Sequence, residues 1–302
     1  MKVHCKILVV ALFGVAMLNA VGHSQEEPDV VKVDSSIVVM NATVRDAKNK
    51  PVSGLTQKDF KIFEDGVPQP IVLFEAQDSP FAAVILIDTS GSMSERISIA
   101  RSAAINFLDG LRADDVAAIY RFDSKVDLVQ EFSNSRDVAD KIFDLKARGM
   151  TVLYDAIQMA AKELKTRTEQ RKAVIVISDG ADTMSGASAD KTLKSALADG
   201  ITIYTIDMST LGENFAARRQ NQGVLRNFAE KTGGVFISTE DGIALRDALK
   251  NIVNEMRNQY TIAFEPSDSK RDGKWHDLEL RIAKPDLVIR TRKGYHAPKG
   301  QH

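Results

Sequence analysis

The sequence has almost no cysteine and no excess of either charge. Its single cysteine, Cys5, lies near the amino terminus, so the rest of the chain can build neither a disulfide nor a thiolate metal site. Any bound metal must then be held by oxygen or imidazole ligands. The 40 Lys and Arg nearly cancel the 41 Asp and Glu, which argues against a strong overall field for nucleic acid or an anionic membrane. At 302 residues, 44% hydrophobic and 27% charged, the chain has an ordinary globular composition with room for two compact domains.

The first 24 residues have the pattern of a secretory signal peptide. Lys2 and Lys6 precede an apolar run at 7–18, and small residues lead from there into a polar stretch at Gln25. The run has roughly a dozen residues, fewer than the ~20 that span a bilayer, although an uncleaved anchor is the alternative. Cys5 precedes the run, whereas a lipoprotein cysteine would follow it. We therefore expect an exported protein, secreted or periplasmic, without stable membrane insertion after signal cleavage.

Residues 80–258 alternate strand patterns with amphipathic helix patterns. The unbroken apolar run Phe81 to Ile87 is typical of a strand covered on both faces. Further strands are expected at 116–122, 173–177, 201–206 and 235–238, and helices at about 94–110, 135–147, 152–166, 187–199, 220–232 and 241–257. This alternation predicts a doubly wound α/β domain with a mostly parallel sheet and helices on both faces. The polar pair Asp123-Ser124 before an apolar segment at 126–132 predicts one hairpin, and hence one antiparallel edge strand.

The flanking segments, 25–79 and 259–302, have the alternation and turns of short strands. Strand patterns occur at 31–44, 60–63, 71–74, 260–264, 275–282 and 287–289. Each flank has only about three strands, which is few for an independent sandwich. We therefore expect the two flanks to pair into one small β-sandwich into which the α/β domain is inserted.

Five oxygen-bearing side chains follow strands or precede a helix of the α/β domain. Asp88, Ser90 and Ser92 alternate along the loop after the first buried strand, and Gly91 permits a tight path there. Ligands of open α/β sheets bind at the carboxyl ends of the strands. Thr151 precedes the helix expected at 152–166, and Asp179 follows another buried strand. Three loops thus bring hard oxygen ligands to one sheet edge, which suits Mg²⁺, Mn²⁺ or Ca²⁺.

Each of these residues also has a simpler role available. Asp88, Ser92 or Ser94 could cap a helix, and Thr151 could cap the helix that follows it. Asp179 with Gly180 could form a turn. The concentration of all five on three neighbouring loops favours a shared site over separate caps.

The order D-x-S-x-S at 88–92, then Thr151, then Asp179 in S-D-G, resembles the metal-ion-dependent adhesion site of von Willebrand factor type A domains. The similarity covers about residues 80–258. It implies that Ser90, Ser92 and Thr151 bind a divalent ion directly or nearly so, while Asp88 and Asp179 orient the shell, often through water. It further implies a protein partner that presents an Asp or Glu carboxylate to the open position of the ion. In family members that change shape, the last helix moves, so the helix at 241–257 is a candidate switch; a static packing helix is the alternative.

The flanks resemble a bacterial secreted family that carries type A domains. The likeness rests on short motifs: Pro51-Val52-Ser53-Gly54-Leu55, Asp59-Phe60, Glu64-Asp65-Gly66 and the terminal Arg292-Lys293-Gly294-Tyr295. No activity is implied by it.

Other polar residues of the α/β domain have weaker signals. We expect Asp182 and Asp190 to cap the helix near 187, with a contact to the partner as the alternative. Arg218 and Arg219 are expected in the loop after the strand ending at Asp207, either solvated or steering an acidic partner.

Enzyme functions find little support in the sequence. There is no G-x-S-x-G elbow, phosphate-binding P-loop or H-E-x-x-H motif, and no histidine of the α/β region could activate Ser90 or Ser92. The leading prediction is a non-enzymatic module for metal-dependent protein binding or adhesion. A structural or assembly component of the cell envelope with a fold-stabilising metal is the alternative, and a metal-dependent hydrolase comes third.

Overall fold

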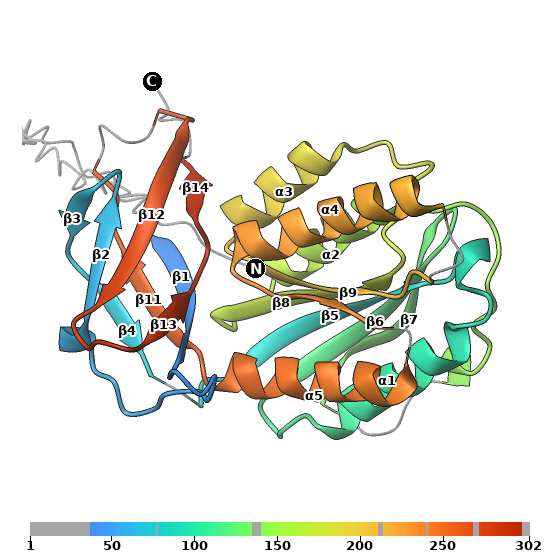
Figure 1. Cartoon of the computed structure of the whole chain (residues 1–302), viewed down its shortest axis with the longest axis horizontal. Coiled ribbons are helices and arrows are strands. Elements are labelled where there is room, and N and C mark those ends of the chain that lie inside the picture. Colours follow the sequence, from blue (N-terminus) through green and yellow to red (C-terminus); the bar gives the residue numbers. More distant parts are fainter. Residues whose placement is uncertain are drawn as a thin grey trace, which may run out of the picture. The chain divides into compact units, whose positions relative to one another are not determined.

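The computed structural model describes residues 37–76, 78–134, 140–210, 214–239, 241–267 and 272–297. The expected signal peptide, 1–24, and the strand pattern at Val31 and Val33 lie outside the described residues. The described chain forms a six-stranded mixed sheet with helices and two antiparallel sheets of four strands each (Figure 1). The first four and last four strands belong to the small sheets, and everything between them belongs to the α/β domain.

The six-stranded sheet has the order β10-β9-β8-β5-β6-β7. Its strands are β5 (Phe81–Asp88), β6 (Val116–Phe122), β7 (Val126–Ser133), β8 (Arg171–Ser178), β9 (Thr202–Asp207) and β10 (Phe236–Ser238). All neighbours pair in parallel except β6 and β7, which form the predicted antiparallel hairpin at one edge. Every residue of β5 is buried, and successive side chains enter two different cores, as Ile85 and Leu86 do.

Helices cover both faces of this sheet (Figure 1). On one face lie α1 (Ile97–Asp109) and α5 (Gly242–Arg257). On the other lie α2 (Leu153–Lys165), α3 (Ala189–Ala198) and α4 (Phe215–Thr232). The predicted doubly wound α/β arrangement is thereby confirmed.

Two of the expected helices differ from the structure. At 135–147, residues 135–139 lie outside the described residues, and the rest holds only a short 3-10 turn, η3 (Asp140–Ile142). The apolar spacing at 135–147 wrongly predicted a helix. Ile142 and Leu145 are both buried, but a 3-10 turn and an irregular segment are enough to bury them. The helix expected at 220–232 starts earlier, because the Asn214 side chain accepts the N–H groups of Ala216 and Ala217.

The two flanks pair into a sandwich with one shared core, as predicted. One sheet has the order β13-β1-β11-β4, the other β14-β12-β2-β3. The strands are β1 (Val38–Arg45), β2 (Phe60–Glu64), β3 (Val67–Gln69), β4 (Leu73–Glu75), β11 (Tyr260–Phe264), β12 (Trp275–Ile282), β13 (Val288–Arg290) and β14 (Gly294–His296). Each sheet mixes amino- and carboxyl-terminal strands, because β1 pairs with β11 and β2 with β12. The short 3-10 turns η1 (Gln57–Asp59) and η2 (Gly91–Met93) complete the described elements.

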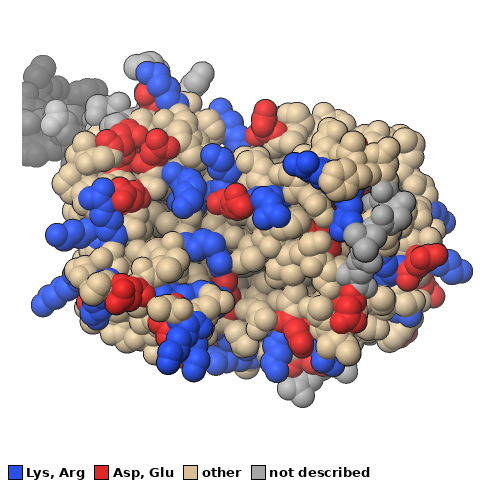
Figure 2. All heavy atoms as spheres, viewed as in Figure 1, with Lys and Arg blue, Asp and Glu red and all other residues tan. Residues whose placement is uncertain are grey.

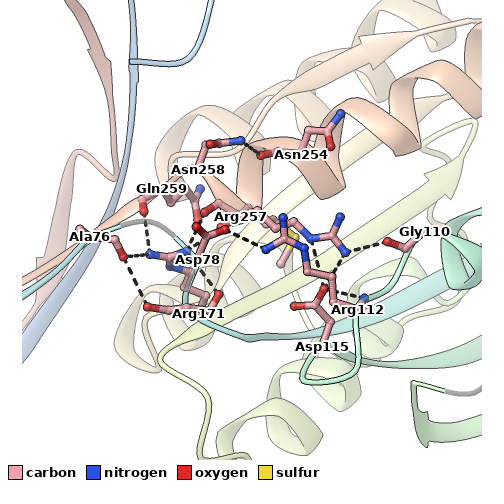
Figure 3. A network of polar contacts seen from close by, with 12 residues as sticks. Ala76, Asp78, Gly110, Arg112, Asp115, Arg171, Asn254, Arg257, Asn258 and Gln259 are labelled. Atoms are coloured by element: carbon pink, nitrogen blue, oxygen red, sulfur yellow. Dashed lines mark hydrogen bonds and ion pairs between the residues drawn. The ribbon is translucent and has the colours of Figure 1, made fainter. Parts of the chain in front are cut away.

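A buried arginine lies where the chain passes between the sandwich and the α/β domain (Figure 3). Arg171, the first residue of β8, is 0% exposed. Its guanidinium donates to the carbonyl oxygens of Ser79, Met256, Arg257, Ala76 and Gln259 and to Thr261 Oγ1, at 2.6 to 3.4 Å. Those acceptors lie on both connecting segments, so one side chain ties the entry and the exit of the α/β domain together.

Surface charge is distributed without a dominant sign. On the face shown in Figure 2, Lys and Arg side chains alternate with Asp and Glu side chains over both the sandwich and the α/β domain. This accords with the near balance of 40 basic and 41 acidic residues in the chain.

A histidine in the sandwich gives a prediction for the pH dependence of stability. His276 is 5% exposed, and its ring nitrogens lie 2.8 Å from Asp65 Oδ2 and 3.1 Å from Asp272 Oδ1. Burial disfavours the imidazolium, but these hydrogen bonds and carboxylate charges outweigh burial and raise the pKa of His276 above 6.5. The folded state therefore binds the proton more tightly than the unfolded state. The stabilisation that protonated His276 contributes is complete below pH 6.5 and is lost as the pH rises through the higher folded-state pKa of His276.

Urea unfolding at pH 5 to 9 measures this contribution. We expect the stability difference between the wild type and His276→Asn to be largest at the acid end and to shrink as the pH rises. Two parallel curves would contradict the prediction.

Candidate functional site

Two neighbouring strands end side by side in polar residues. Because β5 and β8 pair in parallel along their length, Asp88 and Ser178 reach the same sheet edge. Ser178 Oγ donates to Asp88 Oδ2 at 2.5 Å, and Asp88 Oδ1 accepts the N–H of Ser90 at 2.8 Å. Asp179 follows directly, and its Oδ1 accepts the N–H of Ala181 at 3.1 Å. Each carboxylate thus closes a tight turn just past its strand.

The loop that carries Thr151 is joined to both of these turns. The Gly91 N–H donates to the Gly149 carbonyl at 3.3 Å, and the Thr151 carbonyl accepts the N–H groups of Thr183 and Met184, both at 3.0 Å. The loops after β5 and β8 are therefore both hydrogen-bonded to the loop before α2. The structure brings all five residues singled out in the sequence to these adjoining loops: Asp88, Ser90, Ser92, Thr151 and Asp179.

Gly149 allows this close approach. It has a φ of +77°, and a Cβ there would lie 2.6 Å from Ser124 Oγ. The same Ser124 hydroxyl accepts the N–H of Met150 at 3.0 Å. A side chain at position 149 would push the Thr151 loop away from its neighbours.

The two aspartates form a buried pair of like groups with no counter-ion among the described residues. Asp88 is 0% and Asp179 2% exposed, and among the described residues no Lys, Arg or His forms an ion pair with either. Burial, followed by the negative charge of Asp179, raises the pKa of the Asp88 carboxyl from 3.8 to about 7, against the hydrogen bonds from Ser178 and Ser90. Two carboxyls and several hydroxyls on adjoining loops are oxygen donors of the kind that a hard divalent cation prefers.

Aspartates at the ends of the neighbouring strands β6 and β9 have cationic or side-chain hydrogen-bond partners. Asp123, after β6, forms an ion pair with Arg121 at 3.2 Å. Asp207, at the end of β9, accepts at Oδ2 from Gln222 Nε2 and Ser238 Oγ, both at 2.7 Å. Of the four aspartates at this sheet edge, only Asp88 and Asp179 are buried and have, among the described residues, neither a cationic partner nor a side-chain amide that donates to the carboxylate.

The hydroxyl groups extend the site to the surface. Ser90 and Thr151 are 2% and 3% exposed, whereas Ser92 is exposed. The Oγ atoms of Ser90 and Ser92 lie 3.1 Å apart. The Arg96 guanidinium donates to the Ser92 carbonyl at 2.6 Å and also to the Met208 carbonyl, which anchors the loop to the end of β9. Sequence reasoning missed this arginine, since only its folded position reveals the contacts.

Helix capping does not account for Ser92 or Thr151. The N-cap positions of α1 and α2 are Arg96 and Val152, and neither helix has a capping bond from the N-cap side chain. The Asp182 carboxylate instead accepts the N–H of Tyr154 in the first turn of α2, at 2.9 Å.

Three expectations for the surrounding residues were wrong. Asp182 serves α2 rather than the helix near 187, because the chain folds its loop back over the start of α2. The N-cap of α3 is Ser188, with Asp190 in the first turn. Arg218 and Arg219 lie in α4 rather than in a loop, since Asn214 starts that helix early; Arg218 Nε donates to Ser209 Oγ at 3.0 Å.

Two classes of feature were not found in the described part of the chain. No group of three or more His, Cys, Asp and Glu residues there is arranged to hold a metal, so a cation at this edge would depend on hydroxyl oxygens as well. None of the described helices has the length and apolar character required to cross a membrane.

Comparison with known proteins agrees with the architecture. A structure described as von Willebrand factor type A from Catenulispora acidiphila superposes with a TM-score of 0.52 at 14% identity, covering 89% of this chain and 76% of the other. Three N-terminal domains of a type V pili tip protein from Porphyromonas gingivalis give 0.50 at 13% identity, covering 86% and 68%. At these identities the likeness concerns the fold alone.

Sequence comparison also finds a distant relative and a family. An uncharacterized protein of Synechocystis sp. is 26% identical over 184 residues, which are 59% of this chain and 42% of that protein. The chain thus matches less than half the length of this relative. Residues 83–181, which hold all five candidate site residues, match the family of von Willebrand factor type A domains. The mixed sheet and its helices are a von Willebrand factor type A domain, inserted into a β-sandwich.

Proposed function

We propose that the type A domain binds a divalent cation, Mg²⁺ first and Mn²⁺ or Ca²⁺ as alternatives, and through it a carboxylate of a protein partner. Ser90, Ser92 and Thr151 would hold the ion, while Asp88 and Asp179 would orient the shell and balance its charge. The observation that carries this proposal is the buried pair of aspartates without a described counter-ion where three loops meet. A bound ion would supply an open coordination position for an Asp or Glu side chain of the partner.

The surface beside these residues favours protein recognition. Met150 and Met184 are 50% and 56% exposed. They lie on the two loops that the Thr151 carbonyl joins, so they flank the candidate site. Methionine is enriched at protein interfaces relative to the rest of the surface. We infer a non-catalytic binding or adhesion module in an exported protein, secreted or periplasmic.

Ser92 offers the clearest test, because it is exposed and its substitution removes little packing. We expect Ser92→Ala to weaken Mg²⁺ affinity by about tenfold or more, the scale of one lost ligand or supporting group. Isothermal titration calorimetry with MgCl₂ measures the affinity. Ser94→Ala is the matched control, since Ser94 is an exposed serine two residues further on in the same loop. Equal Mg²⁺ affinities in the two variants would contradict the assignment.

The alternative, a structural or assembly role with a fold-stabilising metal, is favoured by the repulsion between the buried aspartates. EDTA separates the two functions. In a pull-down from native extract, the binding function requires that capture be lost on chelation under conditions in which the chain stays folded. If EDTA lowers the melting temperature and leaves capture unchanged in the folded protein, the structural role is correct.

A further inference from the structure

Arg292, from the terminal motif singled out in the sequence, lies in a cavity remote from the aspartate pair. The cavity has a volume of about 390 Å³ and is lined by the start of β1, the second half of α3 and the strand β14. Arg292 lines it and is itself only 7% exposed. The next residues of the motif are structural: a Cβ at Gly294 would lie 2.3 Å from Trp275, and Tyr295 donates to Glu64 at 2.5 Å. Arg292 is the member whose role this packing leaves unexplained.

Arg171 provides a comparison within the same chain. Both arginines are buried and neither pairs with a carboxylate of the described residues. Arg171 donates to six acceptors, which satisfies its guanidinium (Figure 3). Arg292 makes one described hydrogen bond, from Nη1 to the Leu197 carbonyl at 2.8 Å, and its buried Nε has no partner among the described residues. Burial lowers the pKa of both guanidiniums to about 10, so the difference between the two arginines lies in their hydrogen bonds.

Other basic groups line the same cavity. Lys194 and His296 face it, and burial followed by the Lys194 charge lowers the pKa of His296. The buried Nδ1 of His296 also has no partner among the described residues. The acidic side chain in the lining, Asp199, is engaged by Lys165 at 2.8 Å. The cavity therefore presents positive charge that no described acid neutralises.

The remaining walls are apolar. They are formed mainly by Ile37, Val38, Val39, Leu197, Tyr295 and Ala297. A fully hydrated ion such as phosphate would gain nothing from these walls, whereas an apolar group would. The volume of about 390 Å³ lies in the lower part of the range of ~300–1,000 Å³ that is typical of small-molecule pockets.

We propose that this cavity is a second ligand site, which binds a small organic carboxylate with a short apolar body. The guanidinium of Arg292 would take the carboxylate, because its planar donors match the two carboxylate oxygens. Lys194 adds positive charge at the mouth, the His296 ring adds a buried nitrogen that can hydrogen-bond the ligand, and the apolar walls hold the body of the ligand. This site does not depend on the metal centre.

Hexanoate is a suitable probe, with hexanamide as its neutral match and inorganic phosphate as a purely polar anion. Each compound is titrated into the full chain in the presence of EDTA. Calorimetry measures its binding, and thermal unfolding measures the change in melting temperature. We expect hexanoate to bind and to raise the melting temperature, and hexanamide and phosphate to bind at least about tenfold more weakly. Asp88→Asn should keep the full hexanoate response, which separates this result from the metal proposal.

Variants test the role of the arginine. Arg292→Met should remove the hexanoate response while the ligand-free melting temperature holds or rises, because an apolar side chain replaces an uncompensated buried charge. Should Arg292→Met fail to fold, Lys194→Met, on the exposed mouth, must still weaken hexanoate binding. Absence of hexanoate binding to the full chain, or equal binding of phosphate, overturns the proposal. Binding that appears only after removal of residues 298–302 also overturns it, since the chain's own end would then be the occupant.

Discussion

Replacing Arg171 by alanine is expected to lower the free energy of unfolding by about 3–5 kcal/mol, the range measured when buried, hydrogen-bonded charged groups are removed. The substitution would leave five carbonyl oxygens and the Thr261 hydroxyl without their donor, in a site where Arg171 is 0% exposed. Because these acceptors belong to both connecting segments, the sandwich and the α/β domain of the variant should also unfold less cooperatively with each other. Urea unfolding measures the loss of stability and the loss of cooperativity. Trp275 fluorescence reports on the sandwich, and circular dichroism of the helices reports on the α/β domain.

The same network contains a matched control. Arg112 forms an ion pair with Asp78 at 2.8 Å, but the two side chains are 58% and 74% exposed, so Arg112→Ala should change stability little (Figure 3). Arg171→Lys should resemble Arg171→Ala, because three ammonium donors cannot serve six acceptors. If Arg171→Ala unfolds in one transition at the wild-type urea concentration, the network does not hold the two parts together.

The contacts around the end of α5 bear on the candidate switch at 241–257. Arg257 donates to Asp115 Oδ2 at 2.7 Å and to the Gly110 carbonyl at 2.6 Å. Glu255, 4% exposed, accepts from Arg45 at 3.0 Å and from Tyr204 at 2.9 Å. A shift of α5 would have to break these bonds together with those of Arg171. The structure therefore favours the static packing helix.

Features of the fold that depend on local pattern could be predicted from the sequence. The run Phe81 to Ile87 is apolar throughout because both faces of β5 are covered, and the alternation at 275–282 reappears as alternate burial along β12. Pairing of the flanks followed from their being too small to fold separately. By contrast, the pattern at 135–147 fitted a helix equally well, since burying Ile142 and Leu145 does not require one.

The candidate site was predictable for a related reason. Asp88, Ser90 and Ser92 follow a recognisable strand, and strand ends of a parallel sheet meet at one edge. Contacts between distant segments could not be foreseen in the same way. A charged residue that starts a strand, as Arg171 does, would be assigned to the surface. Its burial depends on carbonyls some 90 residues away in both directions along the chain, which no local pattern records.

Asp88→Asn is expected to stabilise the metal-free protein while removing its response to Mg²⁺. In the folded state the pKa of Asp88 is raised to about 7, against 3.8 ordinarily. A raised carboxyl pKa means that the folded state binds the proton more tightly. The contribution of Asp88 to metal-free stability should therefore be greatest below pH 4 and fall as the pH rises to 7, by on the order of 4 kcal/mol. Asparagine cannot ionise, so the variant should lack this loss.

The hydrogen bonds at position 88 allow the substitution. An amide oxygen can accept the Ser90 N–H as the carboxylate does, and the amide nitrogen can donate to Ser178 Oγ once that hydroxyl turns. At pH 8 in EDTA we expect Asp88→Asn to raise the free energy of unfolding by about 2–4 kcal/mol. In MgCl₂ at 100 times the wild-type dissociation constant, the wild type should gain about 2.7 kcal/mol and the variant almost nothing.

Asp207→Asn is the control that ties this effect to the site. Asp207 is also 0% exposed at a strand end, but its Oδ2 accepts from two donors, one of them the Gln222 amide. An amide nitrogen in that place would face another donor, so Asp207→Asn should lower stability and leave the Mg²⁺ response intact. If Asp88→Asn raises the free energy of unfolding and Asp207→Asn lowers it, then Asp88 is retained although its ionised form destabilises the metal-free protein. This result is expected of a residue that binds a cation, because a residue selected only to stabilise the fold would not be destabilising when ionised.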